Sequence, residues 1–371
     1  MNHQKLLTIS IPTWNRSNLI KGLLEELITQ IVSYNLSGEV EILVSNNGSE
    51  DDTHEVVTEL ANNYSFITYN RNATNLGANP NVMLSMQLAS GEYLIFLGDD
   101  DRIKGDSLLR VIDFLKAHRE AGVVIDSFNF KKKNAGTQNF VSLPELLRNY
   151  YWNIGNAGVF VVKSSYVKEC LNKYGAAFFN QCWSQIQFMV LGLFEHKEDK
   201  IYIEDLNIVA ESVHQEVTIY NCFYLWRTGY LELFMAIKAM DSIIGKETLK
   251  PAYEYMKDNI FQFALFNILQ FGVFIDGKEL RVKTRKHIWK NLNPFSFYEK
   301  VILMIIVLWL WIPQSIAKLL GNFFIFITKG KSGIIKKNEF VKMELGKRKK
   351  ALDLKSKAIR KLDFETDGYD S

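Results

Sequence analysis

Cysteines, net charge and a leading apolar segment are scarce or absent in this sequence, and each absence excludes a class of protein. The three cysteines, Cys170, Cys182 and Cys222, form no CxxC pair, which fits a reducing compartment and neither a disulfide framework nor a zinc site. The net charge of +3 is too small to indicate nucleic acid as a partner of the whole chain. Residues 1–5 lack the layout of a signal peptide, so we expect the globular part in the cytosol.

The chain is rich instead in apolar and aromatic residues, arranged in a repeating order. At 371 residues, with 25 Phe, 16 Tyr and 7 Trp, it can form one large domain with an appendage or two domains. The expected strands are residues 6–11, 40–44, 66–70 and 93–97, and the expected helices are 17–31, 52–62, 80–89 and 107–118. This alternation predicts an α/β fold with βαβ units and a mainly parallel central sheet.

Three consecutive aspartates, Asp99, Asp100 and Asp101, follow the apolar strand at residues 93–97. Ligands bind at the carboxyl ends of strands in such sheets, and neighbouring carboxylates that stay ionised need a counter-charge such as a divalent cation. Oxygen ligands suit Mg²⁺ or Mn²⁺, which usually also reach substrate phosphates. The run therefore predicts a metal-bridged phosphate site, with a solvated turn in which Asp106 caps the next helix as the alternative.

Four motifs at the strand ends carry a family resemblance. They are Pro12-Thr13-Trp14-Asn15-Arg16, Ser45-Asn46-Asn47-Gly48-Ser49 with Asp51 to Thr53, Asn75-Leu76-Gly77, and Gly91-Glu92-Tyr93 followed by Leu97 to Asp101. In this order and spacing they resemble the amino-terminal half of family 2 glycosyltransferases, which have the Rossmann-like GT-A fold. The variant FLGDDD is similar to the subset that builds bacterial surface polysaccharides, including abequosyltransferase-like enzymes.

The resemblance implies a nucleotide-sugar site. Thr13 and Arg16 would face the base and the phosphates, and an Arg fork suits a phosphate. Asn46 stands where the family usually has an aspartate that accepts a hydrogen bond from the base, and its amide can still pair with a pyrimidine edge. Arg71 would reach the base or pyrophosphate, or else lie on the surface. The implied substrate-binding residues are Pro12, Thr13, Asn15, Arg16, Asn46, Asn47, Arg71, Asn75, Gly77 and Asp99.

The resemblance also implies a divalent metal, Mn²⁺ or Mg²⁺, bound by the aspartate run. Gly98 stands where the family usually has an aspartate, so the preferred pair is Asp99 and Asp101, with Asp100 as the alternative. His214 is a further candidate ligand because some GT-A enzymes place a late histidine on the metal, and imidazole is an acceptable ligand. A surface histidine is the alternative there.

The acceptor half is expected at residues 123–220, with a strand at 123–130, a glycine-containing turn that enters a strand at 154–163, and a strand at 201–209. Its expected helices begin at 165–171 and at 179–185, and the second ends at about 194. The family usually places an acidic pair in this last helix, and this chain has none there. Inversion at the anomeric carbon needs a group that removes the acceptor proton. The candidates for this catalytic role are Asp126, Glu195 and His196, with His214 nearby as a fourth, and the alternative for Glu195 and His196 is exposure at a helix end.

The carboxyl-terminal part combines apolar and basic sequence. Helices are expected at 225–244 and 253–271, and two apolar runs at 301–312 and 319–327 flank Pro313. The first run is shorter than a bilayer crossing needs, which predicts a re-entrant or in-plane hairpin at 298–328, with a kinked span or a buried helix pair as alternatives. Residues 329–361 then carry thirteen Lys and Arg against three Asp and Glu, a composition that favours anionic lipid over nucleic acid beside an apolar segment.

These features predict a glycosyltransferase domain at 1–220, a helical extension at 221–297, the membrane-associating hairpin and a basic tail at 329–371. We expect a metal-dependent, inverting transfer of sugar from a nucleotide-sugar to a lipid-linked saccharide at the cytoplasmic membrane face, in O-antigen, lipopolysaccharide or capsule assembly. Two other classes stay open. A membrane-bound scaffold on a decayed transferase fold would bind a nucleoside diphosphate without transfer, and a nucleotidyltransferase would release pyrophosphate.

Overall fold

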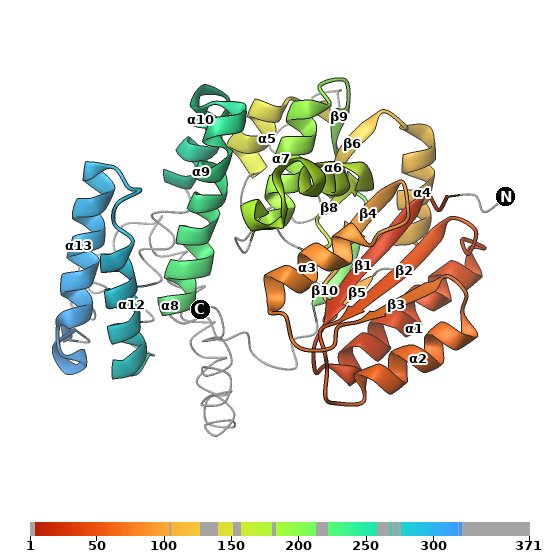
Figure 1. The fold of residues 1–371 in the computed structure, drawn as a ribbon, viewed down its shortest axis with the longest axis horizontal. Helices are drawn as coiled ribbons and strands as arrows, with labels where there is room; N and C mark the ends of the chain where they lie inside the picture. Colours follow the sequence, from red (N-terminus) through yellow and green to blue (C-terminus); the bar gives the residue numbers. More distant parts are fainter. Residues whose placement is uncertain are drawn as a thin grey trace. The chain divides into compact units, whose positions relative to one another are not determined.

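The computed structural model describes residues 4–103, 105–126, 140–150, 157–179, 183–212, 222–257, 268, 272, 276–317 and 319–320. The chain divides into two compact units, one made of Met1–Gln215 with Glu232–Asp258 and the other of Glu216–Leu231 with Asn259–Ser371 (Figure 1). The predicted basic tail and His214 lie outside the described residues.

The amino-terminal half of the first unit contains the predicted βαβ repeats. Its strands are β1 (Leu7–Thr13), β2 (Val40–Asn46), β3 (Ile67–Arg71) and β4 (Tyr93–Phe96), and its helices are α1 (Ser17–Ser33), α2 (Thr53–Asn63), α3 (Ala78–Gln87) and α4 (Ser107–Ala117). The four strands are parallel, in the order β3-β2-β1-β4. Strands β1 and β2 are buried along nearly their whole length, as strands covered on both faces must be.

The second half of this unit adds two antiparallel strands, so the sheet is mixed, but six of its eight strands run in one direction, as the prediction of a mainly parallel sheet states. Its elements are β6 (Ala121–Asp126), β7 (Phe140–Val141), α5 (Leu143–Tyr150), β8 (Phe160–Lys163), α6 (Ser164–Tyr174), η3 (Ala176–Phe179), α7 (Ser184–Glu195) and β9 (Lys200–Glu204). The eight strands follow the order β3-β2-β1-β4-β8-β6-β9-β7. Strand β8 is antiparallel to β4 and β6 because the chain leaves β6 and enters β8 at the same edge, where Ile125 pairs with Phe160.

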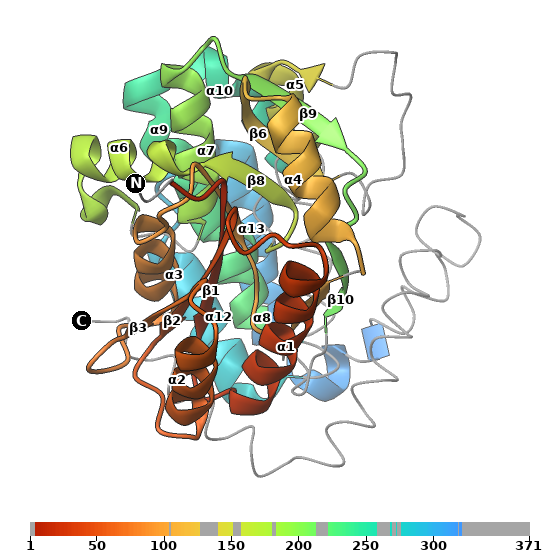
Figure 2. The same cartoon turned by 90° about the vertical axis from the view of Figure 1, so that its right-hand side faces the viewer.

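Helices cover both faces of this sheet. Helices α3, α6 and α7 contact one another, and α1 contacts α2 and α4. Figure 2 shows the strands between α3 and α6 on one side and α1 and α4 on the other. The four parallel strands therefore have their carboxyl ends at one common edge, which is where α/β sheets bind ligands.

The predicted strand at 201–209 is wrong as a single element. Strand β9 ends at Glu204, and the next strand, β10 (Val209–Ser212), leaves the main sheet and pairs antiparallel with β5 (Asp101–Ile103). Asn207, with a φ of 51°, lies in the bend between them. The bend brings residues 209–212 beside the end of the aspartate run, where Ser212 pairs with Asp101.

Helix boundaries downstream also differ from the prediction. The expected helix at 225–244 consists of α8 (Cys222–Trp226), a π-helical segment η4 (Arg227–Glu232) and α9 (Leu233–Ile244). Most of the expected helix at 253–271 lies outside the described residues. Before it, α10 (Lys246–Tyr255) follows Gly245, whose φ of 88° ends α9. A positive φ costs glycine little, so glycine suits such a helix end.

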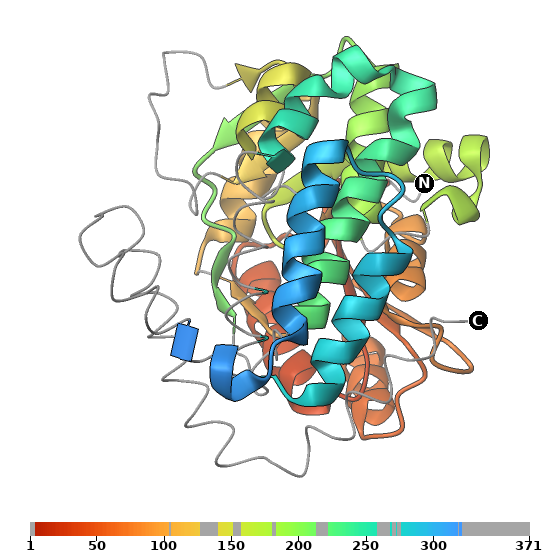
Figure 3. The same ribbon diagram turned by 90° about the vertical axis from the view of Figure 1, so that its left-hand side faces the viewer.

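The second unit contains a helical hairpin that includes the first apolar run. Its helices are α12 (Lys278–Lys290) and α13 (Phe297–Trp311), which lie side by side (Figures 1 and 3). Arg281, near the start of α12, donates hydrogen bonds to the carbonyl oxygens of Leu310 and Ile312, so the two helices are antiparallel. Within the part of the chain that the structure describes, no helix is long and apolar enough to cross a membrane.

Candidate active site

The loops after β1 and β4 meet at Asp99. The Thr13 hydroxyl donates to Asp99 Oδ2 at 2.8 Å, and Arg16 Nη1 lies 2.7 Å from Asp99 Oδ1. The same guanidinium is 3.8 Å from Asp100 Oδ2. The structure thus brings together three residues that the sequence assigns to the nucleotide and metal sites.

The electrostatic environment of Asp99 favours an additional positive charge. Burial raises the pKa of the Asp99 carboxyl group above its ordinary value, and the Arg16 charge and the Thr13 hydrogen bond oppose that rise without cancelling it. The Asp99 side chain is 5% exposed and that of Arg16 is 46% exposed. A divalent cation nearby would favour the ionised carboxylate, and Arg16 has solvent beside it into which it can turn.

Asp100 and Asp101 converge over Gly98. A Cβ at Gly98 would lie 2.8 Å from Asp100 Oδ1 and 3.2 Å from Asp101 Oδ2. The Gly98 N–H also donates to Asp101 Oδ2 at 2.8 Å. The missing side chain therefore leaves room for two carboxylates that face a common space, and oxygen ligands of this kind fit Mg²⁺ or Mn²⁺.

This arrangement differs from the preferred pair of Asp99 and Asp101, because Asp99 is held by Arg16 and Thr13. In the described ranges no group of three or more His, Cys, Asp or Glu side chains is arranged to hold a metal ion. Among the described residues, Asp100 and Asp101 would offer a metal at this point two carboxylates, and Mg²⁺ commonly completes its shell with water and phosphate.

Asn46 is buried and committed to the loop after β2. Its side-chain oxygen accepts the Ser49 N–H at 2.8 Å, and its NH₂ group donates to the Tyr69 hydroxyl at 2.8 Å. The side chain has no exposed surface. The expectation that Asn46 pairs with a nucleotide base therefore does not fit this geometry, since both ends of its amide are engaged inside the protein.

Asn47 joins the loops after β2 and β3. Its NH₂ group donates to Asn75 Oδ1 at 2.7 Å and to the Gly77 carbonyl at 3.1 Å, and its oxygen accepts the Leu76 N–H at 2.9 Å. Asn72 adds a hydrogen bond to Asn47 Oδ1 at 3.0 Å. The predicted residues Asn47, Asn75 and Gly77 are thus brought together, and they shape the loops.

The loops after β1 and β2 are joined in a similar way. Asn15, in the left-handed region with a φ of 51°, donates its N–H to Ser49 Oγ at 2.9 Å and accepts the Glu50 N–H at 2.8 Å. Pro12 pairs in register with Ser45 at the ends of the strands. Pro12 and Asn15, which the sequence predicts as substrate-binding residues, therefore position the backbone of the site.

A cleft of about 640 Å³ opens between these loops. The residues that line it are Trp14, Gly48, Ser49, Glu50, Arg71, Asn72, Ala73, Thr74 and Asn75. A Cβ at Gly48, whose φ is 69°, would come within 2.7 Å of the Thr74 backbone, so glycine allows the close approach of the two loops. The sequence prediction included Arg71 but missed Trp14, although its place in the first motif was a signal for it.

Asp126 lies at the carboxyl edge of the sheet, and its carboxylate holds the bend before β10. It accepts the N–H groups of Asn207 at 3.0 Å and Ile208 at 2.7 Å. Its own N–H donates to the Val159 carbonyl, and the N–H of Gly158, the residue before Val159, donates to the Phe96 carbonyl at the end of β4. Asp126 therefore anchors the segment that pairs with Asp101.

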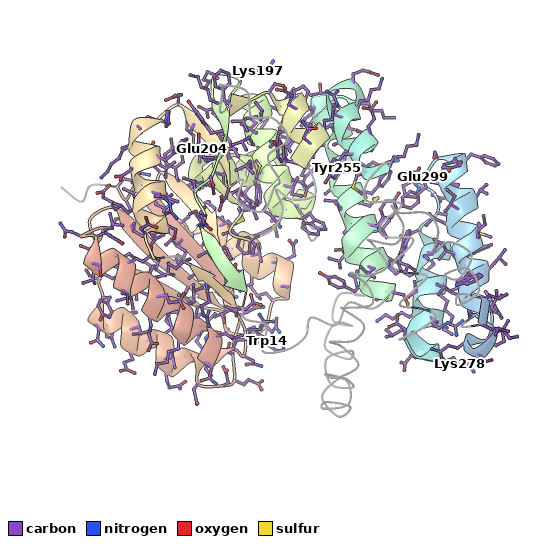
Figure 4. The ribbon with its side chains drawn as sticks, turned by 180° about the vertical axis from the view of Figure 1, so that it is seen from behind. Trp14, Lys197, Glu204, Tyr255, Lys278 and Glu299 are labelled. Atoms are coloured by element: carbon purple, nitrogen blue, oxygen red, sulfur yellow. The ribbon has the colours of Figure 1, made fainter. Side chains whose placement is uncertain are left out.

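Glu195 and His196 lie at the opposite edge of the sheet. The His196 ring stacks on Tyr166, whose hydroxyl bonds to Asp199 at 2.6 Å, and Asp199 pairs with Lys163 at 2.5 Å. Lys163 is opposite Tyr93, the first residue of β4. Figure 4 shows Trp14 and Lys197, the residue after His196, at opposite ends of this unit. This placement argues against the prediction that either residue takes the acceptor proton.

Both side chains form ion pairs between α6 and α7. Glu195 Oε1 is 2.7 Å from Lys173 Nζ, and His196 Nε2 is 2.7 Å from Glu169 Oε2. The Lys173 hydrogen bond lowers the pKa of Glu195, and the Glu169 hydrogen bond raises the pKa of His196. These pairs fit the alternative role, a polar helix end at the surface.

Sequence comparisons agree with the motifs. Residues 8–174 match the model of Glycosyl transferase family 2. Abequosyltransferase RfbV of Salmonella typhimurium is 37% identical over 116 residues, or 31% of this chain and 34% of that protein. The GalNAc(5)-diNAcBac-PP-undecaprenol beta-1,3-glucosyltransferase of Campylobacter jejuni is 36% identical over 103 residues, or 28% of this chain and 32% of the relative. The chain spans about a third of the length of these relatives.

Solved structures agree in fold over a longer part of the chain. Residues 1–349 of S. aureus TarS superpose with a TM-score of 0.51 at 14% identity, covering 82% of this chain and 90% of that one. The mannosyltransferase PcManGT of Pyrobaculum calidifontis, in complex with GDP-Man and Mn²⁺, has a TM-score of 0.50 at 15% identity, covering 82% and 87%. At these identities the likeness concerns the fold alone. Residues 8–174 form a family 2 glycosyltransferase domain, built on a GT-A-like α/β sheet.

Proposed function

We propose that this chain transfers a sugar from a nucleotide-sugar donor to a saccharide acceptor in the assembly of a bacterial surface polysaccharide. The observation that carries the proposal is the meeting of Thr13 and Arg16 with Asp99 at the edge of the sheet where the cleft opens. Relatives named for abequosyl transfer and for glucosyl transfer to an undecaprenol-linked glycan support this class of acceptor.

In this proposal the cleft receives the nucleoside. The Trp14 ring offers a flat apolar surface on which a base can stack, and stacking on an aromatic ring tolerates any base. Arg71 is exposed in the same cleft, with its guanidinium 3.5 Å from the Ser49 carbonyl. Arg16 then faces the diphosphate, because it lies two residues after Trp14 and its guanidinium is 2.7 Å from Asp99 Oδ1.

The proposal includes a divalent cation, Mn²⁺ or Mg²⁺, held by Asp100 and Asp101 over Gly98. When bound, such a cation supplies positive charge to the diphosphate leaving group. Arg16 adds a second positive charge, since its guanidinium reaches Asp99 and Asp100 and is partly open to solvent. A relative of the same fold has Mn²⁺ in its complex with GDP-Man.

The acceptor side of the proposal rests on the segment from β8 to β10. Asp126 fixes the bend that carries residues 209–212 to Asp101, so this segment borders the space above the aspartates. The family resemblance adds inversion at the anomeric carbon and a lipid-linked acceptor as further parts of the proposal. Of the residues predicted as general base, Asp126 lies at this edge.

The test is a panel of nucleotide-sugars incubated with the full chain, Mn²⁺ and a bacterial membrane extract, scored for released nucleoside diphosphate. We expect release from one donor, and loss of that release in Asp101→Ala. Asp113→Ala, an exposed aspartate on α4, is the matched control and should keep the activity.

Other outcomes identify the competing classes. Metal-dependent binding of a nucleoside diphosphate, with no release from any donor in extracts of several polysaccharide-producing strains, would indicate a scaffold protein. Pyrophosphate produced from a nucleoside triphosphate would indicate a nucleotidyltransferase. Release that persists in Asp101→Ala would contradict the assigned metal site.

A further inference from the structure

Helix α13 is apolar on two opposite faces. Its inner face consists of buried residues, Leu303, Ile306, Val307 and Leu310, and packs in the second unit. Its outer face is exposed. The exposed residues and their accessible fractions are Phe297 84%, Tyr298 63%, Val301 43%, Ile305 58%, Leu308 63% and Trp311 66%.

This outer face, which we call the α13 stripe, is a larger exposed apolar patch than the surface of a soluble protein usually carries. Fifteen helical residues span roughly 22 Å at about 1.5 Å per residue. Beyond the helix, Ile316, Leu319 and Leu320 are also 49%, 72% and 42% exposed. Contiguous apolar patches of this extent mark a surface that another apolar phase covers.

The neighbouring helix is strongly basic. Helix α12 carries six Lys and Arg and a single acidic residue, Glu279. Lys286 and Lys290 are exposed one turn apart, and Trp289 between them is 60% exposed. The hairpin therefore presents positive charge and a tryptophan beside an apolar stripe, a combination typical of helices at a lipid surface.

Specific contacts fix the two helices together. The Arg285 guanidinium lies 4.0 Å from the centre of the Trp311 ring, which is on the stripe. Ser296 and Glu299 form a capping box at the start of α13. Together with Arg281, which binds the carbonyls at the end of α13, these contacts hold the stripe and the basic helix in one orientation.

We propose that the α12–α13 hairpin docks this unit on an anionic lipid bilayer, with α13 lying in the plane of the surface. The stripe would enter the boundary between headgroups and acyl chains, and Lys286 and Lys290 would face the lipid phosphates. At roughly 22 Å the helix is shorter than the apolar thickness of a bilayer, about 30 Å, so it lies along the surface. The proposal is independent of the sugar-transfer activity.

Charge complementarity favours lipid over a second copy of the chain. Two stripes facing each other would bring two basic α12 helices into proximity, and like charges disfavour that contact. An anionic bilayer offers both an apolar interior and negative headgroups. The sequence beyond the hairpin, with thirteen Lys and Arg against three acidic residues at 329–361, adds charge of the same sign.

The first test measures binding of the full chain to vesicles of phosphatidylcholine with phosphatidylglycerol by co-sedimentation. Leu308→Glu places a charge at the centre of the stripe and should weaken binding by about tenfold or more. Val32→Glu is the matched control, since Val32 is 59% exposed on α1 in the other unit, and it should bind like the wild type. Circular dichroism checks that both variants are folded, and Leu308→Ser repeats the test without added charge.

The second test addresses the basic helix. The double variant Lys286→Glu/Lys290→Glu should lose affinity for the anionic vesicles and lose part of its salt dependence. Its control is Lys246→Glu/Lys250→Glu, a pair of exposed lysines with the same spacing on α10. Wild-type protein should bind phosphatidylcholine vesicles much more weakly than the anionic ones.

Three results would overturn the proposal. Unchanged binding of a folded Leu308→Glu variant would assign the interaction to another part of the chain. Equal binding to neutral and anionic vesicles would remove the role of charge. An oligomer of the wild type that Leu308→Glu converts to a monomer, with no loss of vesicle binding, would show that a second copy covers the stripe.

Discussion

The transferase domain carries ionisable side chains at both edges of its sheet, and the two groups differ in burial. At the carboxyl edge, Asp99 and Asp101 are 4% and 5% exposed, and Arg16 lies beside Asp99. At the other edge, Glu195 and His196 line a pocket of about 190 Å³ between α6 and α7 and are paired with residues of α6. In the sequence both groups are short runs of polar residues after an apolar segment.

Burial is the property that distinguishes the ionisable groups at the carboxyl edge from those at the opposite edge. Burial removes water from a carboxylate, and a nearby cation favours its ionised form, so the buried aspartate run is suited to bind one. The pairs between α6 and α7 are neutralised locally and screened by solvent, and such pairs contribute little energy.

The largest difference in activity is expected between a charge-removing mutation at the carboxyl edge and one at the opposite edge of the sheet. Asp101→Asn keeps the size of the side chain but removes a charge over Gly98, and we expect sugar transfer to fall roughly a hundredfold. Glu195→Gln removes a charge at the other edge and should change the rate by less than about twofold. Steady-state release of nucleoside diphosphate measures both. A comparable loss of activity in Glu195→Gln would support the prediction that Glu195 is catalytic.

The next effect concerns stability at the carboxyl edge. Asp126→Asn replaces one oxygen by an NH₂ group opposite a backbone N–H of Asn207 or Ile208, which leaves a buried donor without its acceptor. We expect the free energy of unfolding to fall by about 1–3 kcal/mol. Asp205→Asn, an exposed neighbour, should change it by less than about 0.5 kcal/mol. Urea denaturation measures both, and equal values would mean that Asp126 does not anchor the bend.

A smaller and more specific effect should follow from filling the space over Gly98. The methyl group of Gly98→Ala would lie 2.8 Å from Asp100 Oδ1, so this carboxylate must move. We expect the metal concentration for half-maximal activity to rise about tenfold, which is about 1.4 kcal/mol. Gly105→Ala, with no atom within 4 Å of the new methyl group, is the control. If both variants need the same metal concentration as the wild type, the two carboxylates do not share the ion.

The sequence was sufficient for the parts of the fold that depend on local periodicity. The four strands and helices up to α4 follow from alternating apolar segments, and the meeting of Thr13, Arg16 and Asp99 follows because parallel strands end at one edge. The direction of β8 was not predictable in this way, since it depends on the edge from which a long connection returns.

Other misses have identifiable physical reasons. Helix α7 has twelve residues, about 18 Å at 1.5 Å per residue, which is enough to carry Glu195 from one edge of the sheet to the other. The length of this helix could be read from the sequence, and it indicated that Glu195 lies far from the residues at the start of the helix. The burial of Asn46 was not, because it depends on Tyr69 from a neighbouring strand. Motif position alone could not distinguish an amide that faces a ligand from one that holds a loop.

The smallest effect concerns the pH dependence of the surface pairs. The hydrogen bond from Glu169 raises the pKa of His196, and partial burial opposes that rise. A histidine with a raised pKa in the folded state stabilises the protein fully below its unfolded pKa, near 6.5, and this contribution is lost as the pH rises through the folded pKa.

Glu169→Gln should remove this contribution. Because the His196 and Glu169 side chains are 31% and 53% exposed, screening limits it to a few tenths of a kcal/mol. The free energy of unfolding of the variant, measured at about pH 5.5 and about pH 8.5, should therefore differ less between the two conditions than that of the wild type. Glu59→Gln, an exposed glutamate on α2, should behave as the wild type does. If Glu169→Gln also behaves as the wild type does, the ion pair between His196 and Glu169 contributes nothing measurable to stability. The His196–Glu169 and Arg16–Asp99 pairs would then differ in energy although both have a distance of 2.7 Å.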